Sequence, residues 1–109
     1  MQIITFDQLE GATIEANDGV FLGKITFNSI DPESITNPIG IHGSAISALS
    51  IFNQIGQYGR EISSKSPFNP ITSTPPRILM RGQFVAYLTA NPLITPVLDP
   101  GALIDWLQS

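Results

Sequence analysis

The chain has 109 residues, a length that suits one domain with a single modest core. Hydrophobic residues make up 42% of it and charged residues 13%, which excludes a disordered chain, because disorder requires low hydrophobicity and high net charge. The formal net charge is -4 and the five Lys and Arg residues are scattered, so we expect no nucleic-acid partner. The absence of cysteine excludes disulfides, thiolate zinc sites and cysteine nucleophiles.

The amino-terminal segment fits two conformations. Ile3, Ile4 and Phe6 favour the start of a strand, whereas residues 7–10 favour a helical turn. The segment lacks a basic region, and no run of about 18 apolar residues occurs anywhere in the chain. We therefore expect a soluble, cytoplasmic protein with no signal peptide and no membrane span.

Two similar segments bracket the middle of the chain. Residues 19–28 read GVFLGKITFN and residues 82–91 read GQFVAYLTAN, with Gly, Phe, Thr and Asn at matching positions. Both segments are short and apolar, and each begins at a turn pair, Asp18-Gly19 or Arg81-Gly82. Each is therefore expected to be the return strand of a hairpin whose first strand is residues 13–16 or 78–80. We therefore expect β-hairpins over residues 12–28 and 78–91 that pair into a small antiparallel sheet.

Three tandem copies of a 16-residue repeat occupy residues 34–77, between the hairpins. The same residue types recur in three columns: Ser34, Ser50 and Ser66; Asn37, Asn53 and Asn69; Ile39, Ile55 and Ile71. Gly and Asn favour turns and the prolines disfavour helix, so the copies predict loops with very short strands or single helical turns. The third copy lacks the glycines and ends in Pro75-Pro76, which is typical of a terminal cap.

A fourth column of isoleucines extends the same spacing. Its members are Ile30, Ile46, Ile62 and Ile78. Equivalent apolar side chains in tandem repeats commonly stack on one another, so we expect this column to form a buried seam.

A short helix is predicted at the carboxyl end, over residues 99–108. Asp99 suits the N-cap and Pro100 the first helical position. Its apolar face consists of Leu103, Trp106 and Leu107, and we expect the helix to dock through Trp106. The whole pattern predicts a single α+β, mainly β domain over residues 1–109. The alternative is a short β-solenoid with one rung per 16-residue copy and the hairpins as caps.

The repeat consensus, Ser-x-x-Asn-x-x-Gly-x-Tyr-Gly, is clearest over residues 50–59, and Ser66-Pro67-Phe68-Asn69 and Thr74-Pro75-Pro76 follow it. The segment from 18 to 107 resembles a group of short uncharacterised bacterial proteins that is common in cyanobacteria. That group has no assigned activity, so the resemblance implies no ligand and no catalytic residues. The chain departs from the pattern at Ile41-His42, in place of an aromatic residue, and at Arg60, in place of a small one.

No catalytic or metal centre is expected. His42 is the only histidine, no Gly-x-Ser-x-Gly motif accompanies it, and its alignment with Tyr58 favours a structural role. Zinc lacks nitrogen and sulfur ligands here. Calcium is a candidate near one group of oxygen-bearing residues, Asp31, Glu33, Ser34 and Asn37, but a plain turn explains them better, since no EF-hand pattern is present. We expect no metal and no cofactor.

The carboxylates offer a pair of acid and base groups only in principle. The candidates are Asp18, Asp31, Glu33, Glu61, Asp99 and Asp105. Asp18, Asp31 and Asp99 stand directly before Gly or Pro, which favours turn and capping roles.

The repeats also supply a possible binding surface, formed by Asn37, His42, Asn53, Tyr58 and Asn69. Stacked Asn side chains either form an internal hydrogen-bond ladder or line a groove for polar ligands, and the first is favoured. The aromatic residues Phe52, Tyr58 and Phe68 either pack in the core or form a platform for carbohydrate or peptide, and packing is again favoured.

Three functions are compatible with these patterns. The first, which we favour, is a non-enzymatic binding or interaction module for a small polar ligand or a protein, because repeated polar and aromatic elements occur without a catalytic constellation. The second is a structural protein that forms a homo-oligomer through apolar surface such as residues 94–98. The third is a small hydrolase.

Overall fold

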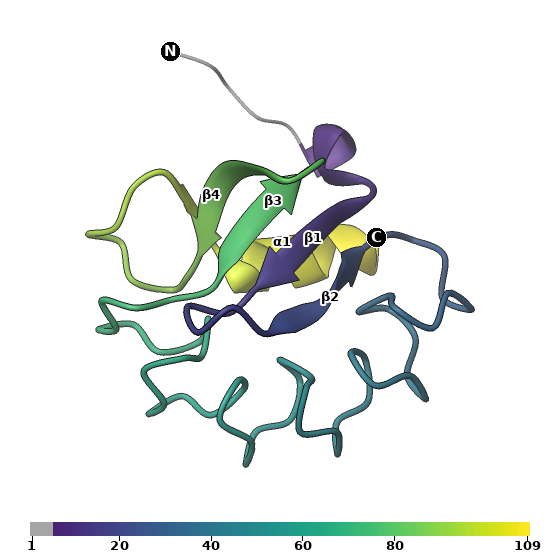
Figure 1. Cartoon of the computed structure of the whole chain (residues 1–109), viewed down its shortest axis with the longest axis horizontal. Helices are drawn as coiled ribbons and strands as arrows, with labels where there is room; N and C mark the ends of the chain where they lie inside the picture. The colour runs from purple at the N-terminus through teal and green to yellow at the C-terminus, as the bar shows by residue number, and fades with distance from the viewer. Residues whose placement is uncertain (1–5) are drawn as a thin grey trace.

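Five strands form one sheet, and a short helix crosses behind it (Figure 1). The computed structural model describes residues 6–109. The strand order is β2-β1-β3-β4-β5, antiparallel except for the parallel pair β4 and β5. In chain order the elements are the 3-10 helix η1 (Phe6–Leu9), β1 (Ala12–Glu15), β2 (Phe21–Ile25), β3 (Arg77–Met80), β4 (Gln83–Leu88), β5 (Val97–Leu98) and α1 (Pro100–Leu107). The α+β, mainly β class is confirmed, rather than a solenoid.

Both predicted hairpins are present. β3 and β4 are joined by Arg81 and Gly82, whose φ values of 54° and 79° are both positive, as a two-residue turn that follows the twist of the strands requires. Gly19 has a φ of 89° in the turn between β1 and β2. The antiparallel pairing of β1 with β3, in which Thr13 faces Leu79, joins the hairpins into one sheet.

Residues 34–74, which we call the turn ribbon, run as an arc of short bends along the β2 side of the sheet (Figure 1, teal). The N–H at the start of each turn donates to the carbonyl at the start of the previous turn, at 2.9 to 3.3 Å in the first two copies. Turns start at Ser34, Asn37, Gly40, Ser44 and Ser47, and again at Ser50, Asn53, Gly56, Arg60 and Ser63. Four steps of three residues and one of four explain the 16-residue period. The prediction of a non-helical repeat segment is confirmed.

Inward-pointing serines stabilise these turns. Ser34, Ser50 and Ser66 are all fully buried. In each case the hydroxyl accepts a hydrogen bond from the N–H two residues later, at 3.0 to 3.1 Å. Serine hydroxyls form such local turns readily, and a buried N–H must find an acceptor. Equal spacing in the sequence therefore does produce equal environments.

The ribbon glycines are needed for space rather than for an unusual backbone angle. A Cβ at Gly43 would lie 2.0 Å from the carbonyl oxygen of Asn37, and one at Gly59 would lie 2.2 Å from that of Asn53. Positive φ values occur instead at glycines outside the ribbon: Gly11, Gly19, Gly23 and Gly82. At Gly43 and Gly59 the close approach of backbone to backbone is therefore what excludes a side chain.

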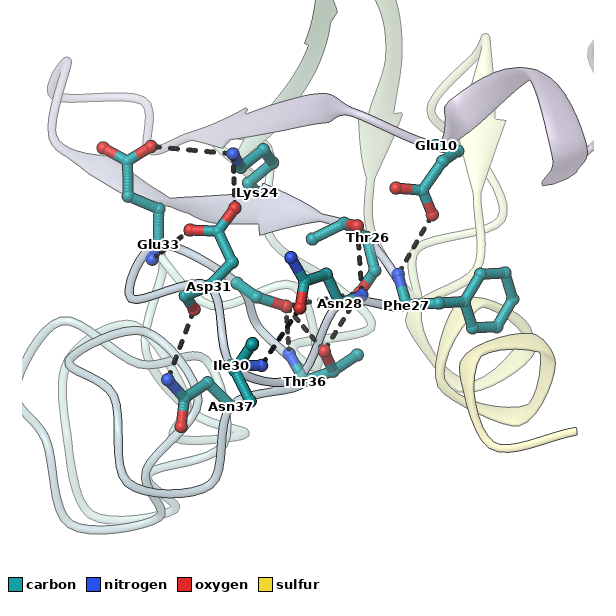
Figure 2. A network of polar contacts seen from close by, with 11 residues as sticks. Glu10, Lys24, Thr26, Phe27, Asn28, Ile30, Asp31, Glu33, Thr36 and Asn37 are labelled. Carbon is teal, nitrogen blue, oxygen red and sulfur yellow. Dashed lines mark hydrogen bonds and ion pairs between the residues drawn. The ribbon is translucent and has the colours of Figure 1, made fainter.

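The start of the ribbon is tied to the edge of β2 (Figure 2). The carbonyl of Thr26 accepts hydrogen bonds from Ser34 Oγ (3.2 Å) and Thr36 Oγ1 (3.0 Å). Lys24 Nζ lies 2.5 Å from Asp31 Oδ2. That contact raises the pKa of Lys24 and lowers the pKa of Asp31. These bonds fix where the first copy lies against the sheet.

Hydrogen bonds of Thr and Asn side chains also tie the end of the ribbon to the segment after β4, as they tie its start to the segment after β2. Asn91 Nδ2 donates to Thr72 O at 2.9 Å. The Thr89 hydroxyl accepts from Asn91 N at 3.0 Å, just as the Thr26 hydroxyl accepts from Asn28 N at 3.1 Å. The two segments that match in sequence therefore play equivalent parts at the two ends of the ribbon.

The expected isoleucine seam is wrong. Ile30, Ile46 and Ile62 are 84%, 90% and 75% exposed. Only Ile78 is buried, and it belongs to β3 rather than to the repeats. The residues that face the core are instead those directly after the buried serines, Ile35, Ile51 and Pro67. The 16-residue period is present in the structure. Each turn, however, has a side that faces the core and a side that faces solvent, and the spacing of residues does not show on which side a given position lies.

α1 covers the core, as predicted. Asp99 Oδ2 accepts from Ala102 N at 2.9 Å and Pro100 occupies the first turn, a favourable N-terminus. Leu103 is fully buried. The Trp106 ring stacks on Phe6 at 5.4 Å and meets the edge of Phe27 at 4.6 Å between ring centroids, so α1 docks partly through Trp106.

The amino-terminal ambiguity is resolved in favour of a helical turn over Phe6–Leu9. The strand considered for Ile3 and Ile4 lies outside the described residues. Within residues 6–109, no helix has the length and apolar character needed to cross a bilayer.

Candidate functional site

The three repeat asparagines are buried and bond to backbone. Asn37, Asn53 and Asn69 each donate from Nδ2 to the carbonyl six residues earlier, at 3.1 to 3.3 Å. Each Oδ1 accepts from the N–H two residues later, at 3.0 to 3.1 Å. These amides form an internal ladder that holds successive turns together. They are therefore not exposed as a ligand surface, in agreement with the packing interpretation.

His42 is also buried. Its Nδ1 lies 3.1 Å from Leu49 O, and its ring meets the edge of Phe21 at 4.9 Å. A Cβ added at Gly23 of β2 would lie 2.8 Å from His42 Cβ, so the ribbon packs directly on the strand here. His42 thus fills space between the first copy and β2.

Tyr58, the equivalent of His42 in the second copy, is buried with its hydroxyl on a carboxylate. Tyr58 Oη donates to Asp18 Oδ2 at 2.9 Å, and Lys65 Nζ approaches the same oxygen at 3.1 Å. Burial, and then the bond to Asp18, raise the pKa of Tyr58. Burial alone would raise the pKa of Asp18, but hydrogen bonds from Lys65, Tyr58 and Val20 N hold it below its ordinary value. This clip ties the β1–β2 turn to the ribbon.

The five residues suggested as a binding surface are therefore all internal. The physical reason is that a ribbon without helix or strand must satisfy its buried backbone groups by side chains, and these polar side chains perform that task.

The carboxylates placed before Gly or Pro perform the expected turn and capping roles. Asp18 Oδ1 accepts from Val20 N (3.2 Å) and Asp31 Oδ1 accepts from Glu33 N (2.9 Å). Of the oxygen-bearing residues weighed for calcium, Asp31 pairs with Lys24 and Asn37 bonds to the Asp31 carbonyl. A turn with an ion pair accounts for them, and residues 6–109 hold no cluster of three metal-ligating side chains.

Two adjoining hollows lie between the turn ribbon and α1. The first has a volume of about 560 Å³ and the second of about 400 Å³. Phe52 and Ile104 line both of them, so the hollows form one groove that follows the helix. We call this feature the ribbon–helix groove.

The ribbon wall of the groove is built from one column of the repeat. Thr36, Phe52 and Phe68 occupy equivalent positions 16 residues apart, and all three line the hollows. Phe52 and Phe68 are half-buried and pack on the core with one side. The helix wall is supplied by Ile104 and Leu107. The sequence did single out Phe52 and Phe68 as aromatic candidates, but it gave no sign that α1 lies opposite them.

The apolar side chains of the two walls, Phe52, Phe68, Ile104 and Leu107, together form the floor of the groove, and charged and polar groups surround it. Arg60, Glu61 and Gln54 line the first hollow and Ser29 and Gln108 the second. Arg60 and Glu61 are exposed, and neither side chain makes a hydrogen bond or ion pair with any residue in 6–109. The groove thus combines an aromatic floor with unpaired charges of both signs at its rim.

The apolar surface considered at residues 94–98 is only partly exposed. Val97 is 42% exposed, whereas Leu98 packs against the core. Both belong to β5, which pairs with Tyr87 and Leu88 of β4.

Comparison with known proteins adds no relative from which a role can be transferred. No family model matches the chain, and searches of curated proteins and of solved structures also found no match. The resemblance to bacterial repeat proteins therefore stays a prediction, and the function has to be argued from geometry.

Proposed function

We propose that this protein is a non-enzymatic binding module that holds a ligand in the ribbon–helix groove. The observation that carries the proposal is the pair of adjoining hollows with Phe52 and Ile104 in common. Their volumes fall in the range of small-ligand sites, roughly 300–1,000 Å³. An apolar floor with a few polar groups at the rim is the composition that such sites share.

The lining favours an amphipathic ligand. An aromatic or aliphatic group fits over Phe52 and Phe68, because ring faces favour offset or edge contacts with other rings. The polar or charged ends of the same ligand meet Arg60 and Glu61 at the rim. This refines the small polar ligand expected from the sequence, since the floor of the groove is apolar.

The position of His42 argues against the hydrolase alternative. A Ser-His-Asp hydrolase would have to use this histidine, which contacts a backbone carbonyl and a phenylalanine ring. A general base must reach the proton of its nucleophile within about 3 Å, and the buried imidazole is instead engaged in packing.

An aromatic probe tests the groove directly. 8-Anilinonaphthalene-1-sulfonate should bind saturably with one site per chain and show energy transfer from Trp106, the single tryptophan, which contacts Phe27 on the wall of the second hollow. Ile104→Gln places an amide on the groove floor and should weaken binding about tenfold or more, which corresponds to about 1.4 kcal/mol.

The matched control is Ile46→Gln, the same substitution at a position that is 90% exposed on the outer side of the ribbon. It should leave the dissociation constant unchanged. Amide chemical shifts recorded during the titration should move at Gly59 and Leu107, which line the groove. Equal weakening by both substitutions, or shifts scattered over the whole chain, would contradict the proposal.

A further inference from the structure

The unpaired charges of the turn ribbon lie together at the first hollow of the ribbon–helix groove. The charged side chains of residues 34–74 are Arg60, Glu61 and Lys65. Lys65 pairs with Asp18. Arg60 and Glu61 are exposed and form no ion pair with each other or with any other residue in 6–109. Both line the first hollow, so a cation and an anion without partners stand side by side at its rim.

The turns themselves do not require charges at these two positions. In the first copy of the repeat the equivalents of Arg60 and Glu61 are Ser44 and Ala45. The N–H groups of Ser44 and Arg60 make the same turn hydrogen bond, to the carbonyl four residues earlier, at 3.0 and 2.9 Å. Because a small neutral residue forms the same turn, the charges of the second copy are free to serve contacts made through the hollow.

The floor of the first hollow includes the two phenylalanines that lack an aromatic partner within residues 6–109. Four of the six phenylalanines contact another aromatic ring there, namely Phe6, Phe21, Phe27 and Phe84. Phe52 and Phe68 do not, and both are half-buried. Aromatic rings attract one another through offset or edge contacts beyond what burial alone supplies. An aromatic group of a ligand would give these two rings the partner that the fold does not.

A ligand that carries both charges matches this rim best. A carboxylate alone would pair with Arg60 but lie close to the like charge of Glu61, and an ammonium group alone would have the converse problem, which costs free energy. The two residues are consecutive, so their Cα atoms are about 3.8 Å apart, and the charges that face them should also be close together. An α-amino acid carries an ammonium group and a carboxylate on one carbon.

We propose that the first hollow binds a free α-amino acid with an aromatic side chain. The ring lies over Phe52 and Phe68, the carboxylate pairs with Arg60, and the ammonium group pairs with Glu61. This inference rests on the proposed function, since it names the class of ligand for the same groove. The second hollow, whose lining is uncharged, is not part of this subsite.

A titration with L-phenylalanine followed by amide chemical shifts tests the class of ligand. We expect a dissociation constant of about 1 mM or lower. The amides of Gly59 and Ile62, which line only the first hollow, should shift more than those of Gly43 and Leu107, which line only the second. Phenethylamine lacks the carboxylate and 3-phenylpropionate lacks the ammonium group. Each should bind about tenfold or more weakly, because each loses one charge-assisted contact.

Two single variants assign each charge of the ligand to its partner. Arg60→Gln should weaken L-phenylalanine about tenfold without weakening phenethylamine. Glu61→Gln should weaken L-phenylalanine to a similar extent without weakening 3-phenylpropionate. The controls are Arg81→Gln and Asp105→Asn, which remove the same charges at exposed positions outside both hollows and should leave all three dissociation constants unchanged. Circular dichroism melts should show that every variant retains its fold.

Equal binding of L-phenylalanine and its two singly charged analogues would overturn the inference, and so would equal binding of the uncharged N-acetyl-L-phenylalaninamide. If 8-anilinonaphthalene-1-sulfonate binds in the groove but L-phenylalanine does not, the class of ligand is wrong and the groove remains a binding site. If neither compound binds, the proposed function fails together with this inference.

Discussion

At the scale of single residues, the turns of the ribbon depend on side-chain acceptors for backbone N–H groups and on glycines where a side chain would clash. Ser50 and Asn53 supply acceptors for the N–H groups of Phe52 and Ile55, which no helix or strand would satisfy. At Gly59 the lack of a side chain is what matters, because a Cβ there would clash with the carbonyl oxygen of Asn53. Polar side chains and missing side chains therefore act together to let the chain turn every three or four residues.

Gly59→Ala should destabilise the protein strongly. The new Cβ would lie 2.2 Å from Asn53 O and 2.6 Å from Ile51 O, both backbone atoms, so we expect a loss of about 3 kcal/mol or more in the free energy of unfolding. Urea unfolding followed by Trp106 fluorescence measures it.

Gly56→Ala is the matched control in the same copy. Its Cβ would first meet the Asn53 side chain, at 3.0 Å, and a side chain yields more easily than backbone. We expect a loss of roughly 1 kcal/mol. Losses of equal size at the two positions would show that the close backbone approach is not what selects glycine.

At the scale of elements, a few side-chain contacts position the ribbon against the sheet. Thr26 and Asn91 tie its two ends. Between them, Tyr58 reaches across to Asp18 in the β1–β2 turn. The sequence aligned Tyr58 with His42 and so predicted a shared structural role, but the partners of these residues come from a hairpin that is distant in sequence.

Tyr58→Phe should lower the free energy of unfolding by about 1–2 kcal/mol near neutral pH, because it removes a hydrogen bond to a carboxylate. The pKa of Asp18 is lowered in the fold, so its contribution is present above the ordinary value of 3.8 and is lost as the pH falls through the folded pKa. The pKa of Tyr58 is raised, so its contribution is present below 10.0 and is lost as the pH rises through the folded pKa.

The difference in unfolding free energy between wild type and Tyr58→Phe should therefore be largest between about pH 5 and pH 9 and shrink on both sides. Tyr87→Phe, in which the ring of a β4 residue stays packed on Phe84, serves as the control and should show no such pH profile. A difference that does not change with pH would mean that the clip contributes through packing alone.

At the scale of the whole molecule, the ribbon and the sheet form one core. Ile35, Ile51 and Tyr58 from the ribbon belong to the same buried cluster as Ile14 of β1 and Leu103 of α1. The groove would not exist without this docking, because the sheet and α1 hold the arc of the ribbon in place.

A synthetic peptide of residues 28–76 should therefore remain unfolded. The turn hydrogen bonds alone do not offset the conformational entropy of the chain, and the apolar inner side of each copy has nothing to pack against. Amide shift dispersion and circular dichroism melts measure this, with the full chain as reference. A dispersed spectrum with a cooperative melt would show that the ribbon is an independent unit.

The sequence by itself determined the elements that depend on local chemistry. Turn pairs specified both hairpins, Asp99 and Pro100 specified the start of α1, and the 16-residue period specified a repeated turn. Tertiary structure decided which side of each turn faces inward, and so placed Ile46 outside and the asparagines inside. It also brought Phe52 and Phe68 opposite Ile104. The physical reason is that backbone hydrogen bonds and caps act over a few residues, whereas burial depends on which distant surface covers a side chain.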